Sequence, residues 1–138
     1  MKRLILQILA KILPIQTAYA HCDLPCGVYN PLQARIEAES ILNIMKKYQE
    51  SKDEVFKIRA ILIKEERAEL VKHHLWVLWT DYFKPEHAKR FPQLHDLFWR
   101  ATKLAGQTKK SVDPKDGEKL LDLIDEIDDI FKKTKAVK

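Results

Sequence analysis

The sequence predicts an all-α protein, an up-and-down four-helix bundle preceded by an N-terminal arm. Three observations support this fold class. Apolar residues recur at helical spacing after residue 31, prolines and polar turns divide the periodic region into four segments, and hardly any segment alternates as a strand does. With 138 residues, 46% of them hydrophobic, the chain is long enough for one domain with its own core.

The first two helices are expected to begin at capping residues. Asn30 followed by Pro31 is typical of a helix start, an N-cap with proline at the first helical position. This helix ends near residues 50–53, and a longer one follows from about Asp53 to Tyr82, where the next proline breaks it. The apolar positions are Ile36, Ile41, Ile44, Met45 and Tyr48 in the first helix and Val55, Ile58, Leu62, Leu75, Leu78 and Trp79 in the second.

The second half of the chain predicts two more helices. The third is less regular, because Pro92 gives it a second start. Gly106 and the polar run "GQTKKSVDPKDG" predict a turn, and Asp113 before Pro114 starts the last helix. The basic end "FKKTKAVK" is expected to be a helix C-terminus that frays. The apolar faces contain Leu94, Leu97, Phe98, Ala101 and Leu104, and then Leu120, Ile124, Ile127 and Phe131.

Residues 1–20 are predicted to be a leader that is removed on maturation. A short basic start, an apolar middle, a proline and small residues at Ala18 and Ala20 are typical of a secretory signal with an A-x-A cleavage site. Lys11 interrupts the apolar stretch, so two alternatives stay open: a pro-segment removed in the cytoplasm and an amphipathic helix that stays attached. The stretch is too short to span a bilayer, which needs about 20 apolar residues. We therefore expect no stable membrane association after processing.

The leader contains three of the basic residues that make the chain positively charged. Removing its three basic residues lowers the formal net charge from +5 to +2. No dense stripe of Lys and Arg with interleaved aromatic residues remains, so nucleic acid is not an expected partner. The mature protein is expected to be exported or periplasmic if the leader is a signal peptide, and otherwise cytoplasmic.

Both cysteines lie in the arm, residues 21–30, which precedes the first helix. Cleavage after Ala20 would give His21 a free amine, so that this amine, the Cys22 amide nitrogen and the thiolates of Cys22 and Cys26 could bind one ion. The His21 imidazole is a candidate fifth ligand. A planar set of two nitrogens and two sulfurs favours Ni(II) or Cu(II) over tetrahedral zinc. The alternatives are a Cys22–Cys26 disulfide and half of a zinc site with ligands elsewhere.

Other conspicuous residues have simpler interpretations. Pro25 restricts the turn between the cysteines, and Gly27 is expected to permit a close backbone approach. His73 and His74 point about 100° apart on a helix, which favours local hydrogen bonding or a subunit contact over one shared metal. The other two histidines of the helices, His87 and His95, are expected at the surface or at an interface. The tryptophans are expected in the core or at an interface: Trp76, Trp79 and Trp99.

Residues 21–29, "HCDLPCGVY", resemble the nickel hook of nickel-containing superoxide dismutases. The similarity continues through residues 34–40 ("ARIEAES"), 63–74 ("IKEERAELVKHH") and 77–85 ("VLWTDYFKP"). It covers essentially all of residues 21–138, whereas the leader lies outside it. The resemblance implies a right-handed four-helix bundle that assembles into a homohexamer with one nickel ion per subunit. It also implies that superoxide becomes dioxygen and hydrogen peroxide while nickel cycles between Ni(II) and Ni(III).

The same resemblance implies the residues of the site. His21, Cys22 and Cys26 correspond to the metal ligands. Further positions match with defined roles: Tyr29 beside the open face of the nickel, Asp23 and Tyr82 holding the hook and its surroundings, and Glu37 and Arg67 orienting the histidine ring. A metal-bound imidazole usually donates its second N–H to an acidic partner, which supports the last pair independently. The alternative for that pair is an ordinary solvated helix charge.

The expected organisation is therefore a leader (residues 1–20), a nickel hook (21–30) and a four-helix bundle (31–138). The expected function is superoxide dismutase activity after cleavage between Ala20 and His21, with superoxide, further copies of the chain and a maturation peptidase as partners. A nickel or copper binding protein without turnover is one alternative, and a bundle stapled by a disulfide is another. The histidine imidazole together with Tyr29 favours the enzyme, because a carrier needs neither redox switching nor a guarded open face.

Overall fold

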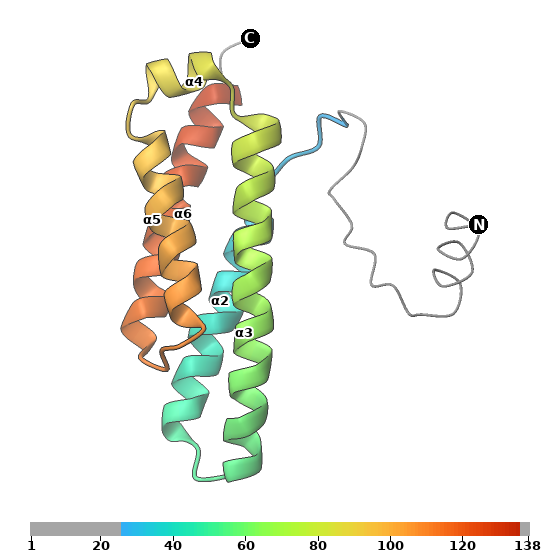
Figure 1. Ribbon diagram of the computed structural model, residues 1–138, viewed down its shortest axis with the longest axis vertical. Coiled ribbons are helices and arrows are strands. Elements are labelled where there is room, and N and C mark those ends of the chain that lie inside the picture. Colours follow the sequence, from blue (N-terminus) through green and yellow to red (C-terminus); the bar gives the residue numbers. More distant parts are fainter. Residues whose placement is uncertain (1–25, 136–138) are drawn as a thin grey trace, which may run out of the picture.

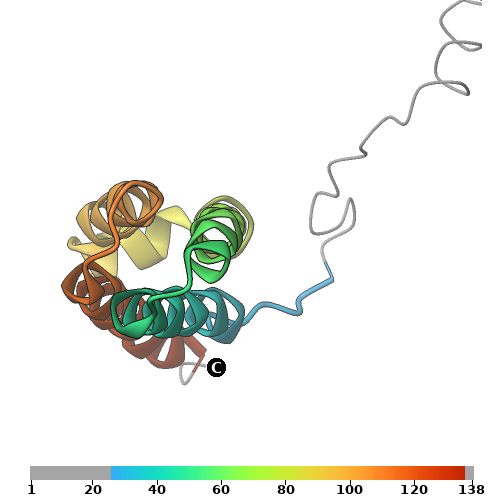
Figure 2. The same cartoon turned by 90° about the horizontal axis from the view of Figure 1, so that it is seen from below.

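The structure is a computed structural model that describes residues 26–135. Four long helices run up and down and occupy the four corners of a bundle (Figures 1 and 2), so the predicted all-α four-helix fold is confirmed. A π-helix prolongs the second of them, and a short helix crosses the end of the bundle (Figure 1). The elements are α2 (Leu32–Glu50), α3 (Glu54–Val77), η1 (Leu78–Tyr82), α4 (Pro85–Arg90), α5 (Leu94–Thr108) and α6 (Pro114–Lys135).

Three of these helices begin at the capping residues that the sequence indicated. The Asn30 side-chain oxygen accepts a hydrogen bond from the Leu32 amide at 2.9 Å, and Pro31 between them already has helical angles. Asp53 accepts from two amides in the first turn of α3, at 2.9 and 3.2 Å. Asp113 accepts from an amide in the first turn of α6 at 3.0 Å. These side chains pair amides that the first turn of a helix leaves without intrahelical partners.

The core lies along the bundle axis and is built mainly from aliphatic side chains. Leu94, Leu97, Phe98 and Ala101 of α5 are buried as predicted, and so is the whole predicted stripe of α6. Ile36 was expected to be buried but is 50% exposed. The buried face of α2 is instead made by small and apolar residues at i, i+4, i+7 and i+11, on the far side of the helix from Ile36: Ala34, Ala38, Ile41 and Met45.

An outward face of α3 is also apolar. Val55, Ile58 and Leu62 are 60–67% exposed, although all three are large aliphatic residues. Closer to its C-terminal end, α3 turns Val71 and Leu75 fully into the core. No helix in the described part of the chain is both long and apolar enough to cross a membrane.

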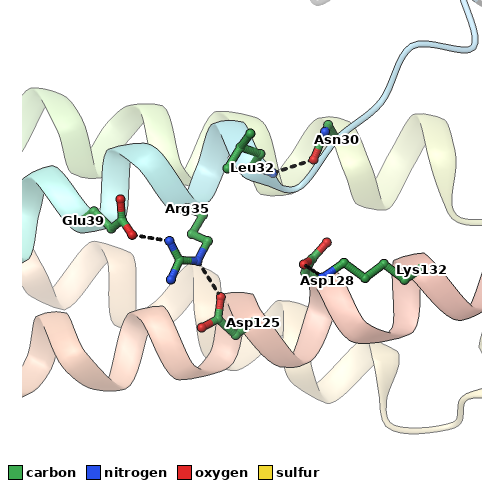
Figure 3. Close-up of polar contacts among 7 residues, drawn as sticks. All are labelled: Asn30, Leu32, Arg35, Glu39, Asp125, Asp128 and Lys132. Carbon is green, nitrogen blue, oxygen red and sulfur yellow. Dashed lines mark hydrogen bonds and ion pairs between the residues drawn. The ribbon is translucent and has the colours of Figure 1, made fainter.

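Two of the contacts between α2 and α6 show how closely these helices are held together. The Arg35 guanidinium donates through Nε to Asp125 at 2.8 Å and also contacts Glu39 (Figure 3). A Cβ atom on Gly117 would lie 3.1 Å from the Leu42 Cα, which shows how closely the two helices approach. A larger side chain at this position would push the helices apart.

The α5–α6 turn is shorter than predicted, because α5 continues past Gly106 to Thr108. A buried lysine of α3 accounts for this longer helix. The Lys64 ammonium donates to the carbonyl oxygens of Thr108 and Lys109, the latter at 2.9 Å, and so pairs carbonyls at the end of α5. Burial lowers the pKa of Lys64, and the charge of Glu65 opposes that shift only in part.

We expect Lys64→Met to lower the free energy of unfolding by about 1–3 kcal/mol, because it leaves two carbonyl groups at the end of α5 without their donor. Urea unfolding followed by circular dichroism measures the change. Lys110→Met is the matched control, since Lys110 is an exposed lysine of the same turn. Equal midpoints for the two variants would show that Lys64 does not stabilise this helix end.

Candidate functional site

The described part of the arm begins at Cys26, whose thiol is exposed. The Val28 amide lies 3.4 Å from the Cys26 sulfur, so the chain turns tightly around the thiol. Gly27 between them has a φ of +69°, a conformation that favours glycine. Among residues 26–135, no atom outside the adjoining residues lies within 4 Å of a Cβ built on Gly27. The backbone angle alone therefore favours glycine at this position, and the close approach expected of Gly27 stays a prediction because the rest of the hook lies outside the described residues.

The arm joins the bundle through a pair of tyrosines. The half-buried Tyr29 ring lies 5.7 Å from the ring of Tyr82, measured between centroids, at an angle of 52°. The Lys135 ammonium of α6 lies 3.5 Å from the Tyr29 carbonyl oxygen. Figure 1 shows the arm leaving the bundle beside α3. Tyr29 precedes α2 and Tyr82 ends η1, so the α2–α3 hairpin brings together two tyrosines that are far apart in the sequence.

The π-helix η1 positions Tyr82. Its widened turn is closed by the Phe83 amide, which donates to the Leu78 carbonyl at 2.9 Å, five residues earlier. Pro85 then prevents the helix from continuing. As a result, Phe83 is buried and Tyr82 is half-buried against the same part of the bundle. Single π-turns within α-helices often lie at functional sites.

Residues from α4 and α6 complete the surroundings of Tyr82. The Tyr82 hydroxyl lies 2.7 Å from the Thr134 hydroxyl, and the Tyr82 ring is 4.5 Å from the Phe131 ring. On another side the His87 ring stacks on Tyr82 at 5.8 Å, and the His87 Nδ1 accepts from the Lys84 amide at 3.2 Å. The sequence pointed to neither Thr134 nor His87 as part of this cluster. Their spacing carries no signal, because the contacts join separate helices.

Glu37 and Arg67, the second predicted pair, also meet. The Arg67 Nη1 donates to a Glu37 carboxylate oxygen at 3.1 Å, and Nη2 donates to Glu66 at 2.6 Å. Burial tends to lower the pKa of Arg67, but the charges of Glu37 and Glu66 outweigh it and hold that pKa above its usual value. The Arg67 Nε is buried and has no acceptor among the described residues. The Glu37 side chain is only 16% exposed, so this pair is more than a solvated helix charge.

The predicted site residues therefore form two groups within one chain. Arg67 and Tyr82 are fifteen residues apart along α3 and η1, which corresponds to about 20 Å at the rise of an α-helix. His21, Cys22 and Asp23 lie outside the described residues. Within residues 26–135, no group of three or more His, Cys, Asp or Glu side chains could hold a metal ion. The predicted metal site depends on the part of the arm before Cys26.

Comparison with known proteins agrees with this organisation. The family model for nickel-containing superoxide dismutase matches residues 16–135. The nickel superoxide dismutase of Streptomyces seoulensis is 58% identical over 116 residues, which make up 84% of this chain and 88% of that protein. The nickel superoxide dismutase of Streptomyces coelicolor is 53% identical over 122 residues, or 88% of this chain and 93% of that protein.

Solved structures extend the similarity to three dimensions. A crystal structure of a nickel-containing superoxide dismutase, with nickel ligation corresponding to the oxidised state, is 56% identical and superimposes with a TM-score of 0.83. A native nickel superoxide dismutase structure is 53% identical, also with a TM-score of 0.83. Each comparison covers 85% of this chain and 100% of the other. The sequence matches the family over residues 16–135 and the described bundle has the same fold as the solved structures, so the chain belongs to the nickel-containing superoxide dismutase family.

Proposed function

We propose that cleavage between Ala20 and His21 completes the active site of this nickel-dependent superoxide dismutase. Its family assigns nickel as the metal and superoxide as the substrate, so two superoxide ions and two protons become dioxygen and hydrogen peroxide. One observation carries the proposal: an unbroken "HCDLPCGVY" stands directly behind the small residues of "AYA". Before cleavage the His21 nitrogen is an amide, and it becomes an amine donor only afterwards.

The donors of the arm fit a nickel ion. The Cys26 thiol is exposed on a tight turn, and the sequence supplies the Cys22 thiolate and amide together with the amine and imidazole of His21. Thiolates and a deprotonated amide suit a metal that prefers square-planar coordination better than they suit zinc. Bound nickel would supply the one-electron cycle between Ni(II) and Ni(III). The proposed ligands are therefore His21, Cys22 and Cys26, with one ion per subunit.

The remaining site residues are proposed to control access and orientation. Tyr29 lies three residues after Cys26 and packs on Tyr82, so its hydroxyl can order water beside the metal and restrict the anions that approach. Asp23 and Tyr82 are proposed to hold the arm in place. Glu37, which Arg67 holds on the surface of α2, is proposed to accept a hydrogen bond from the His21 imidazole.

We further propose that the chain assembles into a homohexamer. The large aliphatic side chains of Val55, Ile58 and Leu62 on α3 are 60–67% exposed, and a cluster of exposed apolar side chains can mark a contact with another chain. A second apolar feature is a groove of about 280 Å³ whose lining includes Trp76, Trp79 and Trp99. Trp76 and Trp99 are 44% and 58% exposed, as anchors of an interface would be. A peptidase that removes the leader is the other proposed partner. The mature protein is proposed to be exported or periplasmic if the leader is a signal peptide, and otherwise cytoplasmic.

The first prediction concerns the free amine. Active protein is expected to begin at His21 in N-terminal sequencing. A chain that starts at His21 and is loaded with nickel should consume superoxide, whereas the same chain with one glycine added before His21 should fall to the background rate. The reason is that the added residue converts the amine into an amide. A glycine added after Lys138 is the control and should leave the rate unchanged.

The second prediction concerns the imidazole. We expect His21→Ala to retain nickel through the two thiolates but to lower superoxide consumption at least tenfold, in line with the ~10–100-fold losses seen when the surroundings of a metal are altered. Stopped-flow decay of superoxide, with nickel content measured on the same samples, tests this. Equal rates in both proteins would exclude the proposed role of the imidazole, and no consumption by either would leave only a metal carrier.

The third prediction separates Glu37 from its neighbour. Glu37→Gln is expected to lower activity or nickel affinity by about 10–100-fold, because the amide orients the imidazole less well than the carboxylate. Glu66→Gln is the matched control, since Glu66 contacts the same arginine but is 65% exposed. Similar losses in both variants would indicate a general effect on Arg67, and no loss in either would exclude the orienting role.

A further inference from the structure

We infer that Thr134 is a positioning residue for the superoxide reaction, because it makes Tyr82 a hydrogen-bond acceptor toward the arm. The inference rests on the proposed function, which places the reaction beside Tyr29. It concerns the direction of a single hydrogen bond. Neither the spacing nor the composition of the sequence indicates it.

The direction follows from counting hydroxyl hydrogens. A threonine hydroxyl has one hydrogen to donate and two lone pairs that accept. The Thr134 Oγ1 lies 2.6 Å from the Phe131 carbonyl oxygen, which can only accept, so the single hydrogen of Thr134 is used there. The Tyr82 hydroxyl lies 2.7 Å from the same Oγ1 and must therefore be the donor in that contact. The hydrogen of Tyr82 consequently points at α6.

Because its hydrogen is used in this contact, the Tyr82 hydroxyl can only accept hydrogen bonds from any other partner. Superoxide is an anion and accepts hydrogen bonds, whereas water and hydrogen peroxide can donate them. Tyr82 therefore offers no hydrogen bond to superoxide but can accept one from water or from the peroxide product. The Tyr29 ring lies 5.7 Å away, between ring centroids. Next to it, the Tyr82 hydroxyl therefore favours neutral hydrogen-bond donors over anions.

The last turn of α6, residues 131–135, is well placed to hold this arrangement. Phe131 is only 5% exposed, and its ring centroid lies 4.5 Å from that of Tyr82. The Lys135 ammonium lies 4.6 Å from the centre of the Phe131 ring and 3.5 Å from the Tyr29 carbonyl oxygen. One helical turn therefore contacts both tyrosines, so a change at Thr134 acts on Tyr82 without needing to move the arm.

Thr134→Val tests the inference because valine has nearly the same shape and cannot accept the hydrogen bond. The freed Tyr82 hydroxyl can then donate to an anion, so azide should inhibit the nickel-loaded variant about tenfold more tightly than the wild type. Thr134→Ser keeps the hydroxyl and should restore the wild-type value. Thr80→Val is the control, since it removes a similar hydroxyl-to-carbonyl bond of 2.8 Å from the helix that carries Tyr82.

A second measurement does not depend on activity. The Fermi doublet of tyrosine in the Raman spectrum responds to whether the phenol donates or accepts, and it can be measured on nickel-free protein. Thr134→Val should change this doublet in the wild-type background and leave it unchanged in a Tyr82→Phe background. The azide effect should likewise vanish in that background, as expected for two residues that act as one unit. If valine prevents folding, Thr134→Ala takes its place.

The outcomes are distinct. An unchanged doublet and unchanged azide inhibition in Thr134→Val would overturn the inference, and so would an effect that serine does not reverse or that persists without Tyr82. Absence of superoxide consumption by the wild-type protein would instead contradict the proposed function. The Raman comparison would still decide the direction of the Tyr82 hydrogen bond in that case.

Discussion

The contact between the tyrosine pair and the last turn of α6 is the interaction on which the rest of the site depends. An arm of ten residues has no periodic core of its own, so its position relative to the bundle must come from its root. Tyr29 supplies that root by packing on Tyr82, which the π-helix and Pro85 hold in place. Phe131 and Thr134 then fix Tyr82 from the other side. Three segments distant in sequence thus determine where the Cys26 thiol emerges.

Much of the fold could be predicted because its signals are local. Asn30, Asp53 and Asp113 cap helices through amides two or three residues away, and such spacing is visible in a sequence. The end of α5 could not be predicted in this way, because Lys64 pairs its carbonyls across a separation of 44 residues. The predicted burial of Ile36 was wrong for a related reason. The face of α2 that meets the other helices contains buried alanines, and alanine contributes little to a hydrophobic pattern.

The candidate site shows the same division. Cys26 and Tyr29 were predicted from a contiguous motif, and Glu37 and Arg67 were predicted from the resemblance. The structure shows that Glu37 and Arg67 are in contact. His87 and Thr134 were missed, because nothing in "PEHAKR" or "FKKTKAVK" distinguishes them from surface residues. The burial of Phe131 was predicted from the apolar stripe of the last helix, whereas the contact between the Thr134 hydroxyl and Tyr82 was not. Tertiary contacts of this kind become visible only when the helices are placed together.

The convergence of the arm root with the end of α6 has a practical consequence for protein engineering. A purification tag fused directly to His21 would turn its amine into an amide, and one at the carboxyl end would follow the turn that carries Thr134 and Lys135. The connection between α2 and α3 lies at the opposite end of the molecule from this turn (Figure 1). An epitope inserted between Ser51 and Lys52 would therefore leave both chain ends in their native form.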